Sequence, residues 1–141
     1  MSQVQKKDAK YLLVNDDRFI CLVVGQQIRK YKPNISVSIK ANGKKAMEYI
    51  EQVFEVGSDT IPNIILLDMQ MPIMDGAAFL KTFSRYKTIV ETTHLYILTS
   101  SADSYVRDVA SQYDFVKDVF ELPLIQEQIE QIHDNLYKER M

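Results

Sequence analysis

The sequence predicts an α/β protein built on a five-stranded parallel sheet with helices on both faces. Short apolar runs alternate with longer amphipathic stretches along the chain, which is the pattern of βα units. One of these runs, Ile64–Leu67, is apolar at every position. A strand with that composition is expected at the centre of a sheet, where helical layers cover both of its faces.

Five βα units account for almost the whole chain. The run from Ile35 to Lys40 alternates apolar and polar residues, which predicts a strand with one exposed face near an edge of the sheet. Gly57 stands where the second helix is expected to stop. The expected strands cover residues 11–14, 35–40, 64–67, 95–98 and 116–122, and the expected helices 18–31, 43–56, 77–86, 104–113 and 125–137.

Length and composition predict one domain over residues 1–141, with residues 1–9 as a flexible tail. The net charge of -2 gives no reason to expect direct nucleic-acid binding. The polar start lacks the apolar core of a signal peptide, and no apolar run approaches the roughly 18 residues of a membrane helix. The only cysteine, Cys21, lies in an apolar helical pattern and is expected to be a buried thiol. We therefore expect a cytoplasmic protein that does not contact a membrane.

Polar side chains follow three of the predicted strands. Asn15-Asp16-Asp17 follow the first strand, Asp68 follows the third, and Thr99-Ser100-Ser101 end the fourth. Sites in open parallel sheets form beyond the carboxyl ends of the strands, so these groups should meet at one edge. Carboxylates about 4 Å apart repel by roughly 4 kcal/mol at an effective dielectric near 20, so the cluster needs protons or a cation. Oxygen ligands of this kind suit Mg²⁺.

Each carboxylate also has a structural alternative. Asp17 precedes the first helix and is as easily a helix cap as a ligand, and Asp75 is expected to be a turn or cap residue. Asp68 fits that alternative less well, because Pro72 and Asp75-Gly76 already supply the turn. His94 and His133 show no metal-ligand spacing, and both are expected to be partly exposed.

These residues carry a family resemblance that covers nearly the whole chain. The segment Ile64–Gly76 resembles the phosphoacceptor segment of response regulator receiver domains almost residue for residue. Residues 11–17 resemble the first receiver strand with its acidic pair, and residues 98–100 the fourth strand with its hydroxyl residue. The chain is similar to stand-alone receivers of two-component signalling. The resemblance implies a flavodoxin-like doubly wound fold with strand order 2-1-3-4-5.

The resemblance also implies roles for individual residues. Asp68 would accept the phosphoryl group as nucleophile, and Thr99 would donate its hydroxyl to it. Mg²⁺ would bind Asp16, Asp68 and the backbone carbonyl of Gln70, with Asn15 in an outer position through water. A register shifted by one would make Asp16 and Asp17 the metal pair instead. Met69, Met71 and Met74 are expected to serve packing.

Two positions depart from the receiver pattern. Receivers carry a Lys before Pro after the fifth strand, whereas this chain reads Leu122-Pro123; the bond before Pro123 is still expected to be cis. Lys117 should lie at the wrong end of that strand to replace the Lys, and Arg18 is expected to point into solvent. Val119 stands where many receivers have an aromatic residue, and the adjacent Phe120 should face the other side of the sheet.

Three functions follow as hypotheses. The first is a stand-alone receiver, phosphorylated on Asp68 by a sensor histidine kinase or phosphotransfer protein, which then acts on a downstream protein or pairs as a homodimer. The second is a degenerate receiver that binds its partner without phosphorylation. The third is an enzyme, either an aspartate-nucleophile phosphatase or a flavin binder. Gln70 replaces the acid a phosphatase needs, and the acidic loop after the first strand would repel a flavin phosphate, so we expect no enzyme beyond self-phosphorylation and slow self-dephosphorylation.

Overall fold

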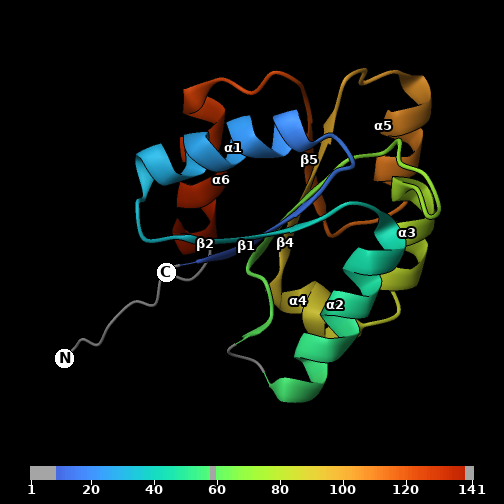
Figure 1. The fold of residues 1–141 in the computed structure, drawn as a ribbon. Helices are drawn as coiled ribbons and strands as arrows, with labels where there is room; N and C mark the ends of the chain where they lie inside the picture. The colour runs from blue at the N-terminus through green and yellow to red at the C-terminus, as the bar shows by residue number, and fades with distance from the viewer. Residues whose placement is uncertain (1–8, 58–59, 139–141) are drawn as a thin grey trace.

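The computed structural model describes residues 9–57 and 60–138, in which five strands alternate with six helices (Figure 1). The strands are β1 (Lys10–Val14), β2 (Ser36–Lys40), β3 (Ile64–Leu67), β4 (His94–Thr99) and β5 (Val116–Glu121). The helices are α1 (Arg18–Tyr31), α2 (Gly43–Val56), α3 (Gly76–Phe83), α4 (Lys87–Thr92), α5 (Ser104–Ser111) and α6 (Gln126–Lys138).

The strands form one parallel sheet in the order β2-β1-β3-β4-β5, which confirms the predicted topology. The strand Ile64–Leu67 is buried along its whole length between β1 and β4. The alternating strand β2 lies at an edge, as its pattern predicted. This register brings the carboxyl ends of all five strands to one side of the sheet.

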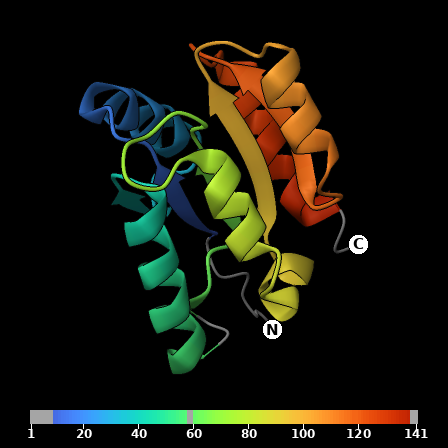
Figure 2. The same cartoon turned by 90° about the vertical axis from the view of Figure 1, so that its right-hand side faces the viewer.

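Two apolar layers hold the sheet between the helices (Figure 2). On one face, buried residues of α2, α3, α4 and α5 pack against the sheet, with Phe79 and Phe83 stacked at 5.5 Å between ring centroids. On the other face, α1 and α6 pack side by side and bury Cys21, Val24 and Ile132. The burial of Cys21 confirms the prediction of an inaccessible thiol.

The third helix ends earlier than the sequence predicts, and an additional short helix follows. We expected one helix over residues 77–86, but α3 ends at Phe83 and α4 begins at Lys87. Between them the backbone turns, with Arg85 and Tyr86 donating to the carbonyls of Thr82 and Phe83 at 3.1 and 2.9 Å. In α4 only Ile89 is buried, so a segment this short has no apolar periodicity by which it could be predicted.

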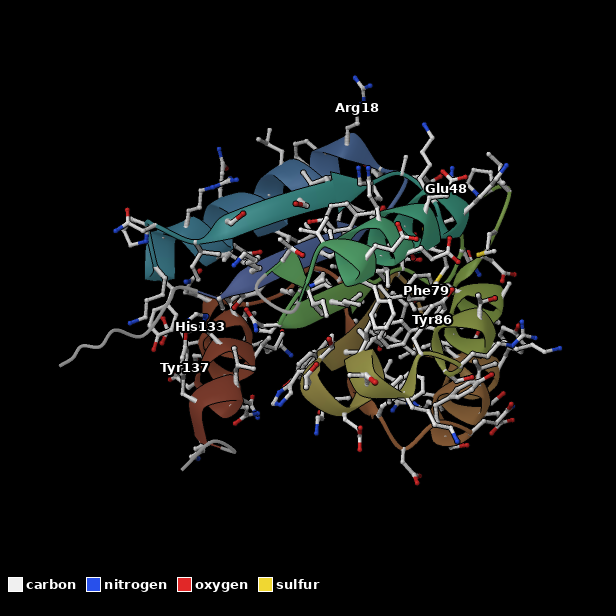
Figure 3. The ribbon with its side chains drawn as sticks, turned by 90° about the horizontal axis from the view of Figure 1, so that it is seen from below. Arg18, Glu48, Phe79, Tyr86, His133 and Tyr137 are labelled. Carbon is white, nitrogen blue, oxygen red and sulfur yellow. The ribbon has the colours of Figure 1, made fainter. Side chains whose placement is uncertain are left out.

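Both histidines were predicted to be partly exposed, and this was wrong. His94 is 8% exposed at the start of β4, and His133 is 3% exposed on α6. The Nδ1 atom of His133 lies 2.8 Å from the hydroxyl of Tyr11, and the two rings stack in parallel. Figure 3 shows His133 beside Tyr137 at the end of the sheet remote from Arg18. A hydrogen bond to β1 therefore compensates for the burial of this imidazole.

The described chain begins in the core of the protein. Residues 1–8 of the expected tail lie outside the described residues, whereas Ala9 is 2% exposed and packs in the core, so it does not belong to a tail. Within the described ranges, no helix is both long and apolar enough to span a bilayer.

Candidate functional site

The strand register places Asn15 and Asp68 next to each other at the carboxyl edge of the sheet. Val14 of β1 pairs with Leu67 of β3, and the backbone N–H of Asp68 donates to the carbonyl of Val14 at 2.9 Å. On the other side of β1, the N–H of Asn15 donates to the carbonyl of Lys40 at 3.0 Å. Both site segments thus begin at fixed backbone positions.

The loop after β1 is organised by its own side chains. Asn15 is buried, and its Oδ1 atom accepts a hydrogen bond from the N–H of Asp17 at 2.8 Å. Asp17 is the N-cap of α1, since its carboxylate accepts from the N–H groups of Phe19 and Ile20 at 2.9 and 3.2 Å. Asp17 therefore adopts the cap role that the sequence left open, whereas no hydrogen bond within the described chain engages the exposed carboxylate of Asp16.

The loop after β3 bends tightly around Asp68. The N–H of Gln70 donates to the Asp68 carboxylate at 3.4 Å, and the N–H of Gly76 donates to the carbonyl of Met69 at 3.0 Å. A Cβ atom on Gly76 would lie 2.7 Å from the Asp68 carbonyl oxygen and from the Met69 Cα atom, so only glycine fits. Asp75 caps α3 through the N–H of Ala78, as expected.

The electrostatics single out Asp68 among the carboxylates of this edge. The pKa of Asp68 is raised to about 6: burial is the largest cause, the charges of Asp16 and Asp17 also raise it, and the backbone N–H groups of Gln70 and Met69 lower it. The same three aspartates raise the pKa of the Cys21 thiol, although burial is the larger cause. The acidic side chains therefore do converge, and no lysine of the described chain is among the groups that shift the pKa of Asp68.

The donor set at this edge fits Mg²⁺. Asp16 and Asp68 offer carboxylates, and the loop containing Gln70 begins directly after Asp68. No group of three His, Cys, Asp or Glu side chains forms a preassembled cage within the described residues. Mg²⁺ does not need one, because it usually keeps several waters and takes one or two carboxylates. Met69 and Met71 are buried in the core, as predicted for packing residues.

Thr99 lies at the end of β4 with its hydroxyl bonded to its own loop. It donates to the carbonyl of Ser101 at 3.2 Å and accepts from the N–H of Ser101 at 3.3 Å. The side chain is 2% exposed. The hydroxyl is therefore engaged within its own loop.

The β5 side of the site is apolar. The N–H of Leu122 donates to the carbonyl of Thr99 at 2.8 Å, and the Leu122–Pro123 bond is cis, as expected. The half-buried Leu122 side chain lines a cavity of about 220 Å³ with Phe19 and Val23 of α1. Lys117 lies near the start of β5, whereas Thr99 pairs with Glu121 at the end of this strand. Lys117 is therefore at the far end of β5 from Thr99, as predicted. Figure 3 shows Arg18 extending from the start of α1 away from the ribbon.

Val119 and Phe120 face opposite sides of the sheet, which confirms their predicted orientation. Val119 packs with the α2–α5 layer, whereas Phe120 packs with the α1–α6 layer. The Phe120 ring stacks on Tyr96 at 5.9 Å between centroids. On the face of the sheet that α5 covers, neither of these two positions therefore supplies an aromatic side chain that Thr99 could contact.

A comparison with protein families agrees with this geometry: residues 11–131 match the model of the response regulator receiver domain. The chain belongs to the receiver domain family of two-component signalling. Solved structures share its fold. A two-component response regulator from Cytophaga hutchinsonii superposes with a TM-score of 0.84 at 18% identity, covering 94% of this chain and 99% of that one. One from Legionella pneumophila gives 0.78 at 20% identity, covering 93% and 99%.

Related sequences place receiver domains in larger proteins. This receiver is 33% identical over 93 residues to hybrid signal transduction histidine kinase M of Dictyostelium discoideum. The match covers 66% of this chain and 4% of that protein. It is 35% identical over 81 residues to a protein-glutamate methylesterase/protein-glutamine glutaminase of Treponema pallidum. That match covers 57% of this chain and 18% of the relative. The chain thus spans only a small part of these relatives.

The structure adds one functional detail that the sequence reasoning missed. In the receiver, Asn15 holds the N–H of Asp17 and so sets the direction of the acidic loop. The signal was available, because asparagine often bonds the backbone two residues further on. The resemblance implies only an outer metal position for Asn15.

Proposed function

We propose that this receiver accepts a phosphoryl group on Asp68 with Mg²⁺ bound at the same edge. The observation that supports the proposal most is the position of Asp68. It directly follows the central strand, remains partly accessible, and lies close enough to Asp16 and Asp17 for their charges to raise its pKa. A carboxylate with a pKa of about 6 is mostly ionised at neutral pH and can act as a nucleophile.

The reaction forms one bond and breaks one bond. A carboxylate oxygen of Asp68 attacks phosphorus in line, and the bond between phosphorus and the donor nitrogen of a phosphohistidine breaks. The electron pair of that bond stays on the imidazole, and Asp68 becomes a mixed anhydride. Asp16, Asp68 and the Gln70 carbonyl would hold Mg²⁺, which neutralises charge on the transferring oxygens when bound.

The chain's own residues then position the product. The N–H of Gln70 already lies 3.4 Å from the Asp68 carboxylate and keeps it oriented. The Thr99 hydroxyl would leave Ser101 and donate to a phosphoryl oxygen, which would move the start of the loop before α5. The change would be read on the surface of α5, β5 and α6, by a downstream protein or a second copy. Asn15 would contact the metal at most through water, because its Oδ1 atom already serves Asp17.

We further propose that phosphorylation comes from a sensor histidine kinase or a phosphotransfer protein in the cytoplasm. Leu122 in place of the usual Lys removes one charge-assisted contact, worth about 1.5–3 kcal/mol, from the phosphorylated state. We therefore expect the phosphorylated state to form, but to be less stable than in a receiver that carries the Lys.

Acetyl phosphate with Mg²⁺ tests this function without knowledge of the kinase. The intact mass of the wild-type protein should increase by one phosphoryl group, and that of Asp68→Asn should stay unchanged. Equal labelling of both proteins would rule out Asp68 as the acceptor. Asp108→Asn is the matched control, because this carboxylate is exposed on α5 and should leave labelling unaffected.

A second candidate is a receiver that binds its partner without phosphorylation. The apolar surroundings of Leu122 favour it, since Phe19 is 71% exposed and lines the same cavity. In that case, Asp68→Asn would leave partner binding unchanged, and Leu122→Lys would weaken it. Loss of the partner in Asp68→Asn would exclude this alternative.

A further inference from the structure

A second cavity lies beside the acidic edge, on the side of β2 rather than β5. It has a volume of about 320 Å³ and is lined from four elements: the loop after β1, the start of α1, the end of β2 and the start of α2. Its polar lining residues are Asn15, Asp16, Arg18, Lys40 and Lys45. The cavity borders the proposed metal site through Asn15 and Asp16, whereas its three cations have no role in the proposed phosphorylation.

The charge of the lining is predominantly positive. Three of the lining side chains are cations and one is a carboxylate. In the described chain, none of the three cations forms a salt bridge, and Lys40 only lies over the ring of Tyr49, at 5.0 Å from its centroid. Cations gathered around one hollow focus their field into it and attract an anion.

The buried amide of Asn15 provides a directional donor in the same cavity. Its side chain is 7% exposed, and its Oδ1 atom is occupied by the N–H of Asp17. The remaining group is the Nδ2 amide, which forms no hydrogen bond within the described residues. Because Asn15 lines the cavity and its oxygen is engaged, it can offer this cavity N–H donors only.

The backbone supports the same preference. The end of β2 is fixed to β1 by the bond from the N–H of Asn15 to the carbonyl of Lys40. Lys45, in the first turn of α2, also lines the cavity. The single carboxylate, Asp16, belongs to the neighbouring acidic edge.

We propose that this cavity is an anion site that binds a phosphate group, held by Lys45, Lys40 and the Nδ2 amide of Asn15. Arg18 stands at the rim, where Figure 3 shows it directed outward, and it can close over a bound anion. The ligand is either free phosphate or a small phosphorylated compound, and both share the dianionic group that the lining recognises.

The test uses Asp68→Asn protein, so its result does not depend on whether Asp68 accepts a phosphoryl group. Isotope-labelled protein is titrated with inorganic phosphate in the presence of EDTA, which prevents binding through Mg²⁺, and backbone amide shifts are followed by NMR. Saturable shifts should appear at the ends of β1 and β2 and at the starts of α1 and α2. The same titration with glycerol 3-phosphate distinguishes the two sources: tighter binding indicates a phosphorylated compound, and equal binding indicates phosphate alone.

Matched variants decide whether the cavity is responsible. Lys45→Gln should weaken phosphate binding about tenfold, the loss expected for one charge-assisted contact. Lys44→Gln removes the same charge from the adjacent position, which does not line the cavity, and should leave binding unchanged. Asn15→Asp keeps the acceptor for Asp17 but replaces the donor by a charge, so binding should be lost.

Shifts that do not saturate, or equal effects of Lys44→Gln and Lys45→Gln, would overturn the proposal, because they indicate diffuse attraction to surface lysines. Phosphate binding retained in Asn15→Asp would overturn it as well. If Asn15→Asp does not fold, the pair of lysine variants still decides the question.

Discussion

Replacing Asp68 by asparagine should stabilise the metal-free protein at neutral pH. The folded state holds this carboxyl at a pKa of about 6, whereas an unfolded chain holds it near 3.9. A folded pKa above the unfolded one means that ionisation opposes folding. The cost is absent below about pH 4, grows as the pH rises towards about 6, and is complete above it.

The difference of about 2 pKa units corresponds to at most about 3 kcal/mol. Asp68 is partly accessible, so water screens part of this cost, and about 1–2 kcal/mol remains. Urea unfolding in EDTA at a series of pH values measures it. Above pH 7, Asp68→Asn should be more stable than wild type by that amount, and the difference should vanish at about pH 4.

Asp108→Asn is the matched control, because it removes an exposed carboxylate of α5 and should not change the pH profile. Mg²⁺ should stabilise the wild-type protein and leave Asp68→Asn almost unaffected. An Asp68→Asn protein that is no more stable than wild type above pH 7 would refute the conclusion that burial and the neighbouring aspartates destabilise the ionised form of Asp68.

Three further changes test the surroundings of Asp68. Leu122→Lys should raise the phosphorylated fraction in acetyl phosphate by about tenfold or more at low donor concentration. Leu22→Lys, at an exposed position on α1, should not raise it, and equal effects of the two variants would contradict a local charge contact. Gly76→Ala should destabilise the fold by about 1–3 kcal/mol in urea unfolding, because the new Cβ atom meets backbone at 2.7 Å. Gly25→Ala, whose Cβ atom meets only the end of Arg29, should instead stabilise α1, and similar losses in both would disprove the close approach at Gly76. Ile73→Gly should raise the melting temperature. Ile73 is 78% exposed and has a φ of 72°, a conformation that costs a β-branched residue about 1–2 kcal/mol. A lower melting temperature would show that the Ile73 side chain contributes stabilising contacts.

The sequence predicted the sheet and the acidic edge because their signals are local. The fully apolar run Ile64–Leu67 identified the central strand, and the polar residues after each strand identified the edge at which they meet. The division of residues 77–92 into α3 and α4 was not predictable, because it depends on a turn and on one buried side chain, Ile89.

Contacts between distant segments were the least accessible from sequence. The amphipathic pattern of the last helix predicts an exposed His133, but its burial depends on Tyr11, which is 122 positions away. The cavity beside Asn15 likewise requires the pairing of β1 with β2, which brings Lys40 and Lys45 next to Asn15. The charges of these lysines could be read from the sequence, but their location beside Asn15 could not.

Chemical trapping of the phosphorylated residue tests the central claim most directly. After reaction with acetyl phosphate and Mg²⁺, borohydride reduces an acyl phosphate to an alcohol and so converts the modified aspartate to homoserine. Peptide mapping should then locate homoserine at Asp68 and at no other aspartate. Homoserine at Asp16 or Asp17, or its absence from a protein that has gained a phosphoryl mass, would contradict the assignment of Asp68 as the phosphoryl acceptor.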